Sequence, residues 1–286
     1  MSKVLILGLG HVGKALAERL RADGVTVVGT TTTPAKLEPL QAFADEVHLA
    51  RGTDAETIAR IAQGCDAIVT TVAPNVRQAR NREEREATYH DALVASCQSA
   101  AAANPRVMFL SSFSVYGDGG PGADPITERT AVSNTEEPSA RYYSLAEQAV
   151  LASDQGCVLR LPDIYGAPGD FSFADRVKLA HEIMGGKGPF SADARLYIIH
   201  FQDVVAATYH ALQSNLTGVY NVCVNEGVPK TNAEVFDTLA ERVGVPKLEF
   251  LGQIKAPTRK ISADRLYATG WRPAHTDPDF PLRQPA

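Results

Sequence analysis

A glycine-rich segment close to the amino terminus constrains the fold of this chain more than any other feature. An apolar run over residues 3–7 leads into residues 8–13, which read GLGHVG, and a helical pattern over residues 14–21 follows. The G-x-G-x-x-G spacing is typical of a strand-to-helix turn that binds a pyrophosphate at the free N–H groups of the helix start. We therefore predict a dinucleotide site that includes Gly8, Gly10, His11, Val12 and Gly13. A glycine-rich turn without a ligand is the alternative.

Strand-like and helix-like segments alternate through the first half of the chain. Apolar runs over residues 25–30, 46–49, 66–72, 107–112 and 158–161 are interleaved with amphipathic patterns over residues 34–43, 56–63, 82–103 and 141–153. Apolar strands separated by helices are typical of a parallel sheet that is covered on both faces. We predict an α/β fold, a doubly wound parallel sheet of the Rossmann type.

Glycine and proline become frequent after about residue 160, and the best later helical pattern covers residues 231–243. Doubly wound sheets bind ligands at the carboxyl ends of their strands, where a loop-rich cap can select a substrate. We predict a dinucleotide-binding domain over residues 1–160, to which residues 195–224 add sheet elements. Residues 161–286 are expected to form mainly a small, loop-rich substrate cap that is interleaved with the first domain.

Composition narrows the class of protein further. The chain has 286 residues and a formal net charge of -5, with no basic run of the kind that binds nucleic acid. No apolar run is long enough to span a membrane, and no leader pattern precedes Gly8, so we expect a cytoplasmic protein. The cysteines lack a CxxC pairing and the histidines lack metal-ligand spacing, which predicts free thiols and no metal. These cysteines are Cys65, Cys97, Cys157 and Cys223.

The choice of cofactor is usually made at the end of the second strand, where an acidic residue selects NAD. Here residues 29–34 read GTTTTP, and Lys36 follows. Hydroxyl groups and a lysine could hold a 2′-phosphate, so NADP is predicted and NAD is the alternative. The threonines could instead cap the next helix, with Thr33 at the cap position. The cofactor site is completed by residues that follow this and other strands: Thr30, Thr31, Thr32, Lys36, Thr71, Val72, Ala73, Pro162 and Ile164.

Several further motifs occur at characteristic intervals. Residues 111–117 read SSFSVYG, 160–166 read RLPDIYG, 199–205 read IHFQDVV, 218–222 read GVYNV and 270–273 read GWRP. Together the motifs resemble the extended short-chain dehydrogenase/reductase superfamily, which contains nucleotide-sugar epimerases and dehydratases. The resemblance covers nearly the whole chain. It implies that Ser112 holds the reacting oxygen and that a later Y-x-x-x-K pair supplies an acid/base tyrosine and a lysine that lowers its pKa.

The chain departs from the Y-x-x-x-K pattern. Residues 139–148 read SARYYSLAEQ, so Tyr142 is followed four residues later by Ala146, and Tyr143 by Glu147. Aligning Glu147 with the glutamate usual in the superfamily instead puts Ser139 at the tyrosine position and Tyr143 at the lysine position. No alignment supplies a lysine, and no matching asparagine occurs around Thr88. The chain therefore resembles the atypical branches, in which this motif is degenerate.

The missing lysine has a chemical consequence. An unassisted tyrosine has a pKa of about 10, so it can donate a proton to a carbonyl oxygen but is a poor base. Adjacent helical residues diverge by about 100 degrees, so only one of the two tyrosines can face the cofactor. The other is expected to pack against neighbouring elements or face solvent. The predicted catalytic residues are Ser112 and Tyr143, with Tyr142 as the alternative tyrosine.

The resemblance also implies a substrate site at the same edge of the sheet, formed by Phe113, Ser114, Tyr165, Arg195 and His200. For His200, a structural hydrogen bond is an equal alternative. The first functional hypothesis is an NADP(H)-dependent carbonyl reductase acting on a small polar substrate. The alternatives are an epimerase or dehydratase with no net redox change on a sugar-like substrate, and a regulator that binds NADP without catalysis. Residues 82–103 and 141–153 match helices that pair in dimers of the superfamily, so a homodimer is expected.

Overall fold

A parallel sheet forms the centre of the molecule. A computed structural model describes residues 1–133, 137–277 and 279–283. Seven strands lie in the order β10-β6-β5-β4-β1-β2-β3, and each printed pairing between them is parallel. They are β1 (Lys3–Leu7), β2 (Thr26–Thr31), β3 (Glu46–Leu49), β4 (Ala67–Thr70), β5 (Val107–Ser112), β6 (Cys157–Leu161) and β10 (Gly218–Asn221). The predicted doubly wound α/β sheet is confirmed.

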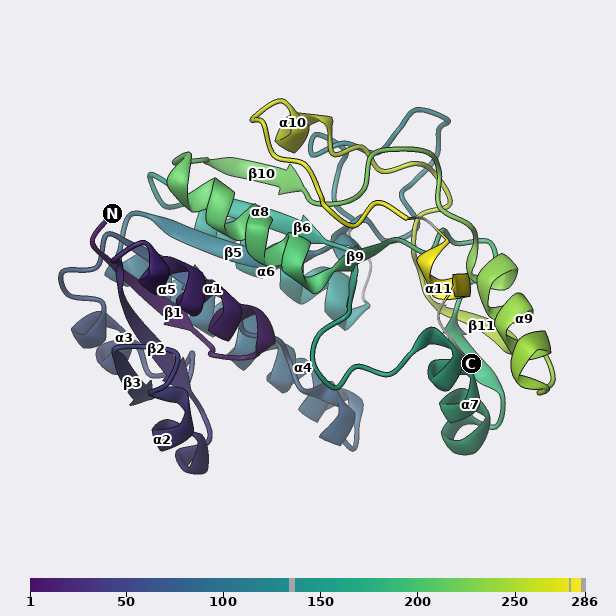
Figure 1. Ribbon diagram of the computed structural model, residues 1–286, viewed down its shortest axis with the longest axis horizontal. Coiled ribbons are helices and arrows are strands. Elements are labelled where there is room, and N and C mark those ends of the chain that lie inside the picture. Colours follow the sequence, from purple (N-terminus) through teal and green to yellow (C-terminus); the bar gives the residue numbers. More distant parts are fainter. Residues whose placement is uncertain (134–136, 278, 284–286) are drawn as a thin grey trace.

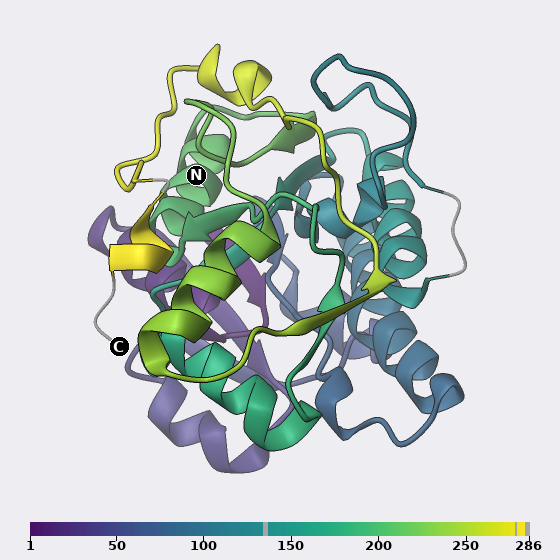
Figure 2. The ribbon, with the colours of Figure 1, turned by 90° about the vertical axis from the view of Figure 1, so that its right-hand side faces the viewer.

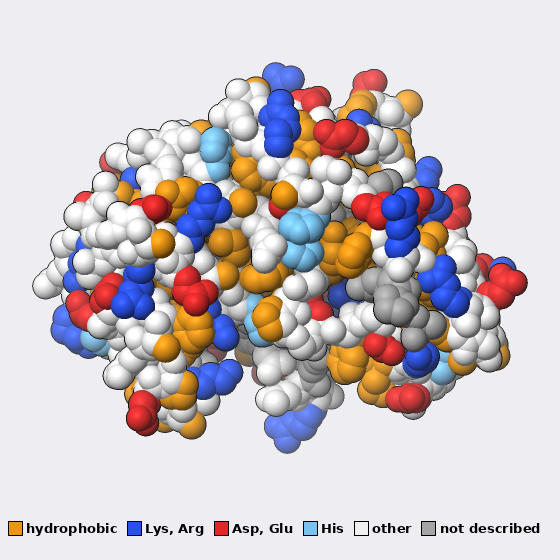
Figure 3. Space-filling view, viewed as in Figure 1, with side chains coloured by type: hydrophobic (Ala, Val, Ile, Leu, Met, Phe, Trp, Pro, Cys, Tyr) orange, Lys and Arg blue, Asp and Glu red, His pale blue; other side chains and the backbone are white. Residues whose placement is uncertain are grey.

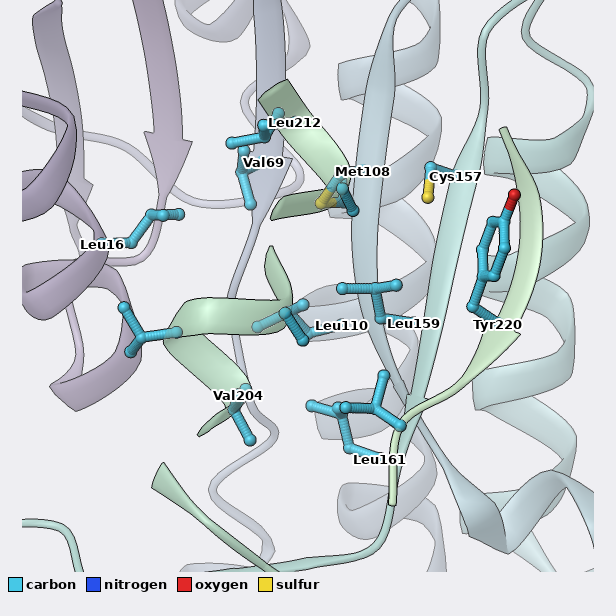
Figure 4. Packing of buried hydrophobic residues seen from close by; sticks show 14 of the residues in the cluster. Leu16, Val69, Met108, Leu110, Cys157, Leu159, Leu161, Val204, Leu212 and Tyr220 are labelled. Atoms are coloured by element: carbon cyan, nitrogen blue, oxygen red, sulfur yellow. The ribbon is translucent and has the colours of Figure 1, made fainter. Parts of the chain in front are cut away.

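Helices cover both faces of this sheet (Figure 1). On one face lie α1 (His11–Ala22) and α8 (Phe201–Gln213), and on the other lie α3 (Ala55–Ile61), α5 (Ser96–Ala103) and α6 (Pro138–Leu151). Figure 4 shows side chains of one buried cluster, with Leu16, Val204 and Leu212 from these helices and Val69, Leu110 and Leu159 from the strands. Phe109, between Met108 and Leu110, points into the core on the opposite face. Burial on both faces explains why these strands are apolar at nearly every position.

The remaining elements form a cap with a small core of its own. Two parallel pairs, β7 (Asp163–Tyr165) with β9 (Ile198–His200) and β8 (Lys187–Phe190) with β11 (Glu249–Ile254), accompany the cap helices. These helices are α7 (Phe173–Met184), α9 (Asn232–Val243) and α11 (Phe280–Arg283), whereas α10 (Asp264–Tyr267) packs beside β10 at the edge of the central sheet. The side chains of Phe173, Val177 and Leu239 pack together in the cap core. Figure 1 shows α7, α9, α11 and β11 gathered at one end of the molecule, and Figure 2 looks onto that end with the sheet behind it.

Two predicted helices differ from the structure. The helix expected over residues 82–103 is interrupted: α4 (Arg82–Tyr89) leads into π-helical turns at His90–Ala95 before α5 begins. The helix expected over residues 34–43 is a short 3₁₀ turn at Pro34–Lys36 followed by α2 (Leu37–Leu40), in which Pro39 lacks an N–H donor. Within residues 161–286, expected to form mainly a loop-rich cap, α7 and α8 occur because the glycines and prolines lie between the helices.

The surface carries charges of both signs. Figure 3 shows lysine and arginine side chains intermingled with aspartate and glutamate over the face that it presents. Within the described residues, every helix is too short or too polar to cross a lipid bilayer.

Candidate active site

A cavity of about 900 Å³ opens where strand order reverses, at the carboxyl ends of β1 and β4. Small-molecule sites commonly occupy roughly 300–1,000 Å³, and doubly wound sheets bind ligands at this position. Its wall brings together nearly all the residues that we predicted for the cofactor: Gly8, Gly10, His11, Val12, Thr30, Thr31, Thr32, Lys36, Thr71, Val72, Ala73, Pro162 and Ile164. Gly13 is the remaining predicted cofactor residue, and it lies behind the wall.

The three glycines of the turn serve different purposes. Gly8 has a φ of 95°, and a Cβ there would lie 2.9 Å from Cγ1 of Val72. A Cβ on Gly13 would lie 2.3 Å from the carbonyl oxygen of Gly8, so this glycine permits close packing of α1 on β1. Gly10 differs, because its φ of -77° is ordinary and a Cβ there would meet no protein atom within 4 Å. The fold requires Gly8 and Gly13, whereas Gly10 keeps the space in front of the turn open.

The start of α1 offers hydrogen-bond donors to that open space. Helix α1 begins after Gly10 without a side-chain cap, so its first N–H groups have no side-chain partner at the cap position. A phosphate group at a helix start accepts such hydrogen bonds. The open space before Gly10 and the uncapped helix start both fit the pyrophosphate of a dinucleotide.

The threonines around the turn divide into two groups. Oγ1 of Thr30 accepts a hydrogen bond from N of Gly8 at 2.9 Å, and Oγ1 of Thr71 donates to O of Gly8 at 2.5 Å. These two side chains therefore hold the turn in shape. Thr32 and Thr33 are exposed instead, and Thr33 makes no side-chain cap, contrary to the capping alternative. Thr32 and Lys36 are therefore the predicted side chains that are free to meet a 2′-phosphate.

Ser112 and Tyr143, the predicted catalytic residues, both line the cavity. Ser112 ends β5, and its Oγ accepts a hydrogen bond from N of Ser114 at 3.1 Å. The Tyr143 ring lies 6.0 Å from the ring of Phe109 in a stacked arrangement, and 6.5 Å from that of Tyr89. Burial raises the pKa of the Tyr143 phenol well above its ordinary value. Tyr143 therefore presents a neutral hydroxyl group at neutral pH.

Tyr142 points elsewhere. Its ring stacks on Tyr89 at 6.1 Å, and its Oη lies 3.5 Å from Oε2 of Glu86, outside the cavity wall. The structure thus places only one of the two adjacent tyrosines at the cavity, as the helical geometry predicted.

A buried polar network beneath the cavity escaped the sequence analysis. The Glu147 carboxylate binds the Arg160 guanidinium in a bidentate pair, with Nη2 to Oε2 at 2.7 Å and Nε to Oε1 at 3.0 Å. Ser111 donates to the same carboxylate at 2.5 Å, and Arg160 donates to Oη of Tyr116 at 2.9 Å. Tyr116 in turn donates to Oδ1 of Asn221 at 2.7 Å. The network ties β5, α6, β6 and β10 together.

This network also bears on the alignment of α6. Glu147 joins Ser111 and Arg160, which belong to two of the motifs that carry the resemblance. The alignment that places Glu147 at the usual glutamate is therefore better supported than the other alignments. In this alignment Tyr143 takes the lysine position of the Y-x-x-x-K motif, and Ser139 takes the tyrosine position. Ser139 lies one helical turn from Tyr143 and donates its hydroxyl to the Glu137 carboxylate, outside the cavity wall.

None of the five predicted substrate residues is among the described residues that line the cavity. Arg195 donates to the carbonyl oxygens of Thr258 and Pro229, so its guanidinium joins loops of the cap. The His200 ring lies 3.7 Å from the His275 ring, and its Nδ1 accepts from N of Gln202 at 3.3 Å, which fits the structural alternative. The other three belong to packed or turn positions: Phe113, Ser114 and Tyr165. Motif membership did not reveal where these side chains point.

Other residues take their place in the wall. The wall also contains residues that sequence reasoning missed: Asn75, Thr88, Ala167, Asp170 and Phe201. On the β3 side, Arg51, Gly52 and Thr53 contribute, and their position directly after a predicted strand was the available signal. Within the part of the chain that the structure describes, no cluster of three or more metal-binding side chains occurs.

Comparison with known proteins agrees with this geometry. A sequence model described as the NAD dependent epimerase/dehydratase family matches residues 4–223. Protein YeeZ of Escherichia coli (strain K12) is 28% identical over 275 residues, covering 91% of this chain and 91% of YeeZ.

Solved structures share the fold. The Bordetella bronchiseptica enzyme WbmG in complex with NAD gives a TM-score of 0.74 at 21% identity, covering 98% of this chain and 91% of WbmG. A second WbmG structure holds NAD and UDP, with a TM-score of 0.73 at 22% identity and the same coverage. The dTDP-glucose 4,6-dehydratase of Bacillus anthracis in complex with NAD gives 0.71 at 17% identity, covering 96% and 93%. The family match spans most of the chain, which therefore belongs to the NAD dependent epimerase/dehydratase family, within the extended short-chain dehydrogenase/reductase superfamily that its motifs predicted.

Proposed function

We propose that this protein is an NADP(H)-dependent epimerase or dehydratase that acts on a sugar-like substrate without net oxidation or reduction. The observation that carries the proposal is that Ser112 and Tyr143 line the same cavity as the glycine turn. Family membership supports this chemistry, and the similar enzyme WbmG binds both NAD and UDP. The carbonyl reductase hypothesis has no such support from the family or from the similar proteins.

The cavity residues suit the cofactor in two ways. The open space before Gly10 accommodates the pyrophosphate, and the β2 end from Thr30 to Thr33 carries hydroxyl groups and no carboxylate that would repel a 2′-phosphate. When bound, the dinucleotide supplies the acceptor and donor of a hydride.

The polar side chains near β5 act on the substrate oxygen. Ser112 would hold the reacting oxygen by a hydrogen bond, and Tyr143 would hold a proton at Oη. Because burial raises the pKa of this phenol, Tyr143 keeps its proton at neutral pH and can donate it to a carbonyl oxygen, although as a weaker acid than an ordinary phenol. Accepting a proton from a hydroxyl group requires the phenolate, which becomes more populated as the pH rises.

One observation favours a second candidate, a protein that binds the dinucleotide without turnover. The described cavity wall contains one lysine, Lys36, and one arginine, Arg51. Both lie near the ends of β2 and β3, away from Ser112. A cation that would lower the pKa of Tyr143 is therefore missing from the described wall.

The proposed function is tested by incubating the protein with NADP⁺ and a panel of UDP- and dTDP-linked sugars. We expect an isomerised or dehydrated product, detected by NMR and mass spectrometry, while the total amounts of NADP⁺ and NADPH stay constant. Stoichiometric consumption of NADPH with a ketone or aldehyde would instead support the reductase. Tight dinucleotide binding without any product would support the second candidate.

The role of Tyr143 is tested by Tyr143→Phe, with Tyr142→Phe as a control from the same helix. We expect Tyr143→Phe to lower turnover by about 10²–10⁴-fold, because general acid–base groups contribute that much. The wild-type rate of alcohol oxidation should rise toward alkaline pH as the phenol ionises, and this rise should vanish in Tyr143→Phe. Cofactor affinity, measured by calorimetry, should change little. Full activity of Tyr143→Phe would show that the proton comes from another group.

A further inference from the structure

The segment that follows β3 is held firmly against the cavity. N of Ala50 donates to O of Thr31 at 3.1 Å, and Oγ of Ser99 donates to O of Gly52 at 2.7 Å. Gly52 packs so closely that a Cβ there would lie 2.0 Å from Oγ of Ser96. These contacts fix the backbone on both sides of Arg51 at the edge of the cavity.

The Arg51 side chain is exposed and lines the cavity. Among the described residues, it has no carboxylate within ion-pair distance, although most of the arginines described have one or bind a backbone carbonyl. Asp91 also lines the cavity and lies 3.1 Å from Nδ1 of His90. Arg51 therefore has a fixed backbone and a guanidinium that is free to bind a ligand.

Strand pairing brings Arg51 beside the end of β2. Thr31 pairs with Leu49 and O of Thr31 accepts a hydrogen bond from N of Ala50, so Arg51 directly follows the residue bonded to the end of β2. Lys36 lines the same wall. Two cations, from the segments that follow the neighbouring strands β2 and β3, therefore line the cavity together with Thr32.

We infer that Arg51 is the residue that determines cofactor specificity, because it binds the 2′-phosphate of NADP(H) together with Lys36 and Thr32. This inference rests on the proposed use of NADP(H). An arginine near the β2 end is the usual partner of a 2′-phosphate, and the β2 segment here has none. Arg51 supplies the missing group from β3, since a guanidinium offers two parallel donors to phosphate oxygens.

An arginine at this place could also stack on the face of the adenine ring without binding a phosphate. The two roles differ in what they discriminate. Stacking strengthens the binding of every adenosine ligand equally, whereas phosphate binding strengthens only ligands that carry a 2′-phosphate.

The test compares two fragments, 2′,5′-ADP and 5′-AMP, by calorimetry with the full-length protein. We expect the wild type to bind 2′,5′-ADP at least about tenfold more tightly than 5′-AMP. Arg51→Gln should remove most of this ratio and leave the affinity for 5′-AMP unchanged, and Arg51→Lys should restore part of it. The matched control is Arg60→Gln, which removes the same charge from an exposed site on α3 outside the cavity wall and should alter neither affinity.

Each contrary outcome has a distinct meaning. An equal loss of affinity for both fragments in Arg51→Gln overturns the inference in favour of stacking. An unchanged ratio in Arg51→Gln overturns it while the use of NADP(H) stands. A wild type that does not discriminate between the fragments contradicts the proposed NADP(H) preference itself.

Discussion

Arg160→Met is expected to lower the free energy of unfolding by about 3–5 kcal/mol, because it leaves the Glu147 carboxylate buried without its cation. The side chains of both partners are about 5% exposed or less. Burial alone would lower the pKa of the Arg160 guanidinium, but Glu147 raises it above its ordinary value, so the guanidinium stays charged. Tyr116 would also lose the hydrogen bond that Arg160 donates. Chemical denaturation of the two proteins measures the difference.

A double variant provides the control. Replacing buried ion pairs by apolar residues of similar volume is often neutral, so Arg160→Met combined with Glu147→Leu should regain much of the lost stability. A double variant that is less stable than Arg160→Met would show that Ser111 and Tyr116, rather than the ion pair, dominate the stability of the network.

Gly10→Val is expected to weaken dinucleotide binding by at least about tenfold, which corresponds to about 1.4 kcal/mol or more. The valine side chain would enter the open space before the turn, where the Cβ position meets no protein atom. The backbone tolerates the change because the φ of Gly10 is -77°. The folding cost should therefore stay near that of a weaker helix cap, about 1 kcal/mol.

Gly10→Ser separates the two effects. Serine is a favourable cap, so this variant should keep or gain stability, yet it still places atoms in the space reserved for the pyrophosphate. Weaker binding in a fully stable Gly10→Ser would assign the loss to steric blockage. Unchanged binding in both variants would mean that the phosphates lie elsewhere.

The sequence predicted those parts of the fold that depend on local patterns. The strand at residues 107–112 matches β5, because apolar side chains on both faces are a local signal, and the strand at residues 46–49 matches the edge strand β3. The glycine turn was equally readable, since Gly8 and Gly13 are required by contacts with Val72 and with the turn itself. The predicted cofactor residues follow from the strands and the glycine turn, because most of them lie at strand ends.

The rest depends on contacts between distant segments. No local pattern distinguishes Glu147 as buried, and its partner Arg160 comes from a different strand. Arg51 acquires its place only through the pairing of β2 with β3. Tyr165 and His200 lie in motifs, but their side chains point into the cap core and onto His275. The homodimer and the cytoplasmic location remain predictions from the sequence.

The most direct test of this account is a calorimetric titration of the wild-type protein with NADPH and, separately, with NADH. We predict one site per chain, a dissociation constant in the micromolar range or tighter for NADPH, and weaker binding of NADH. Equal or tighter binding of NADH would contradict the NADP(H) assignment. Absence of binding by both would contradict the central claim that the cavity at the carboxyl ends of β1 and β4 is a dinucleotide site.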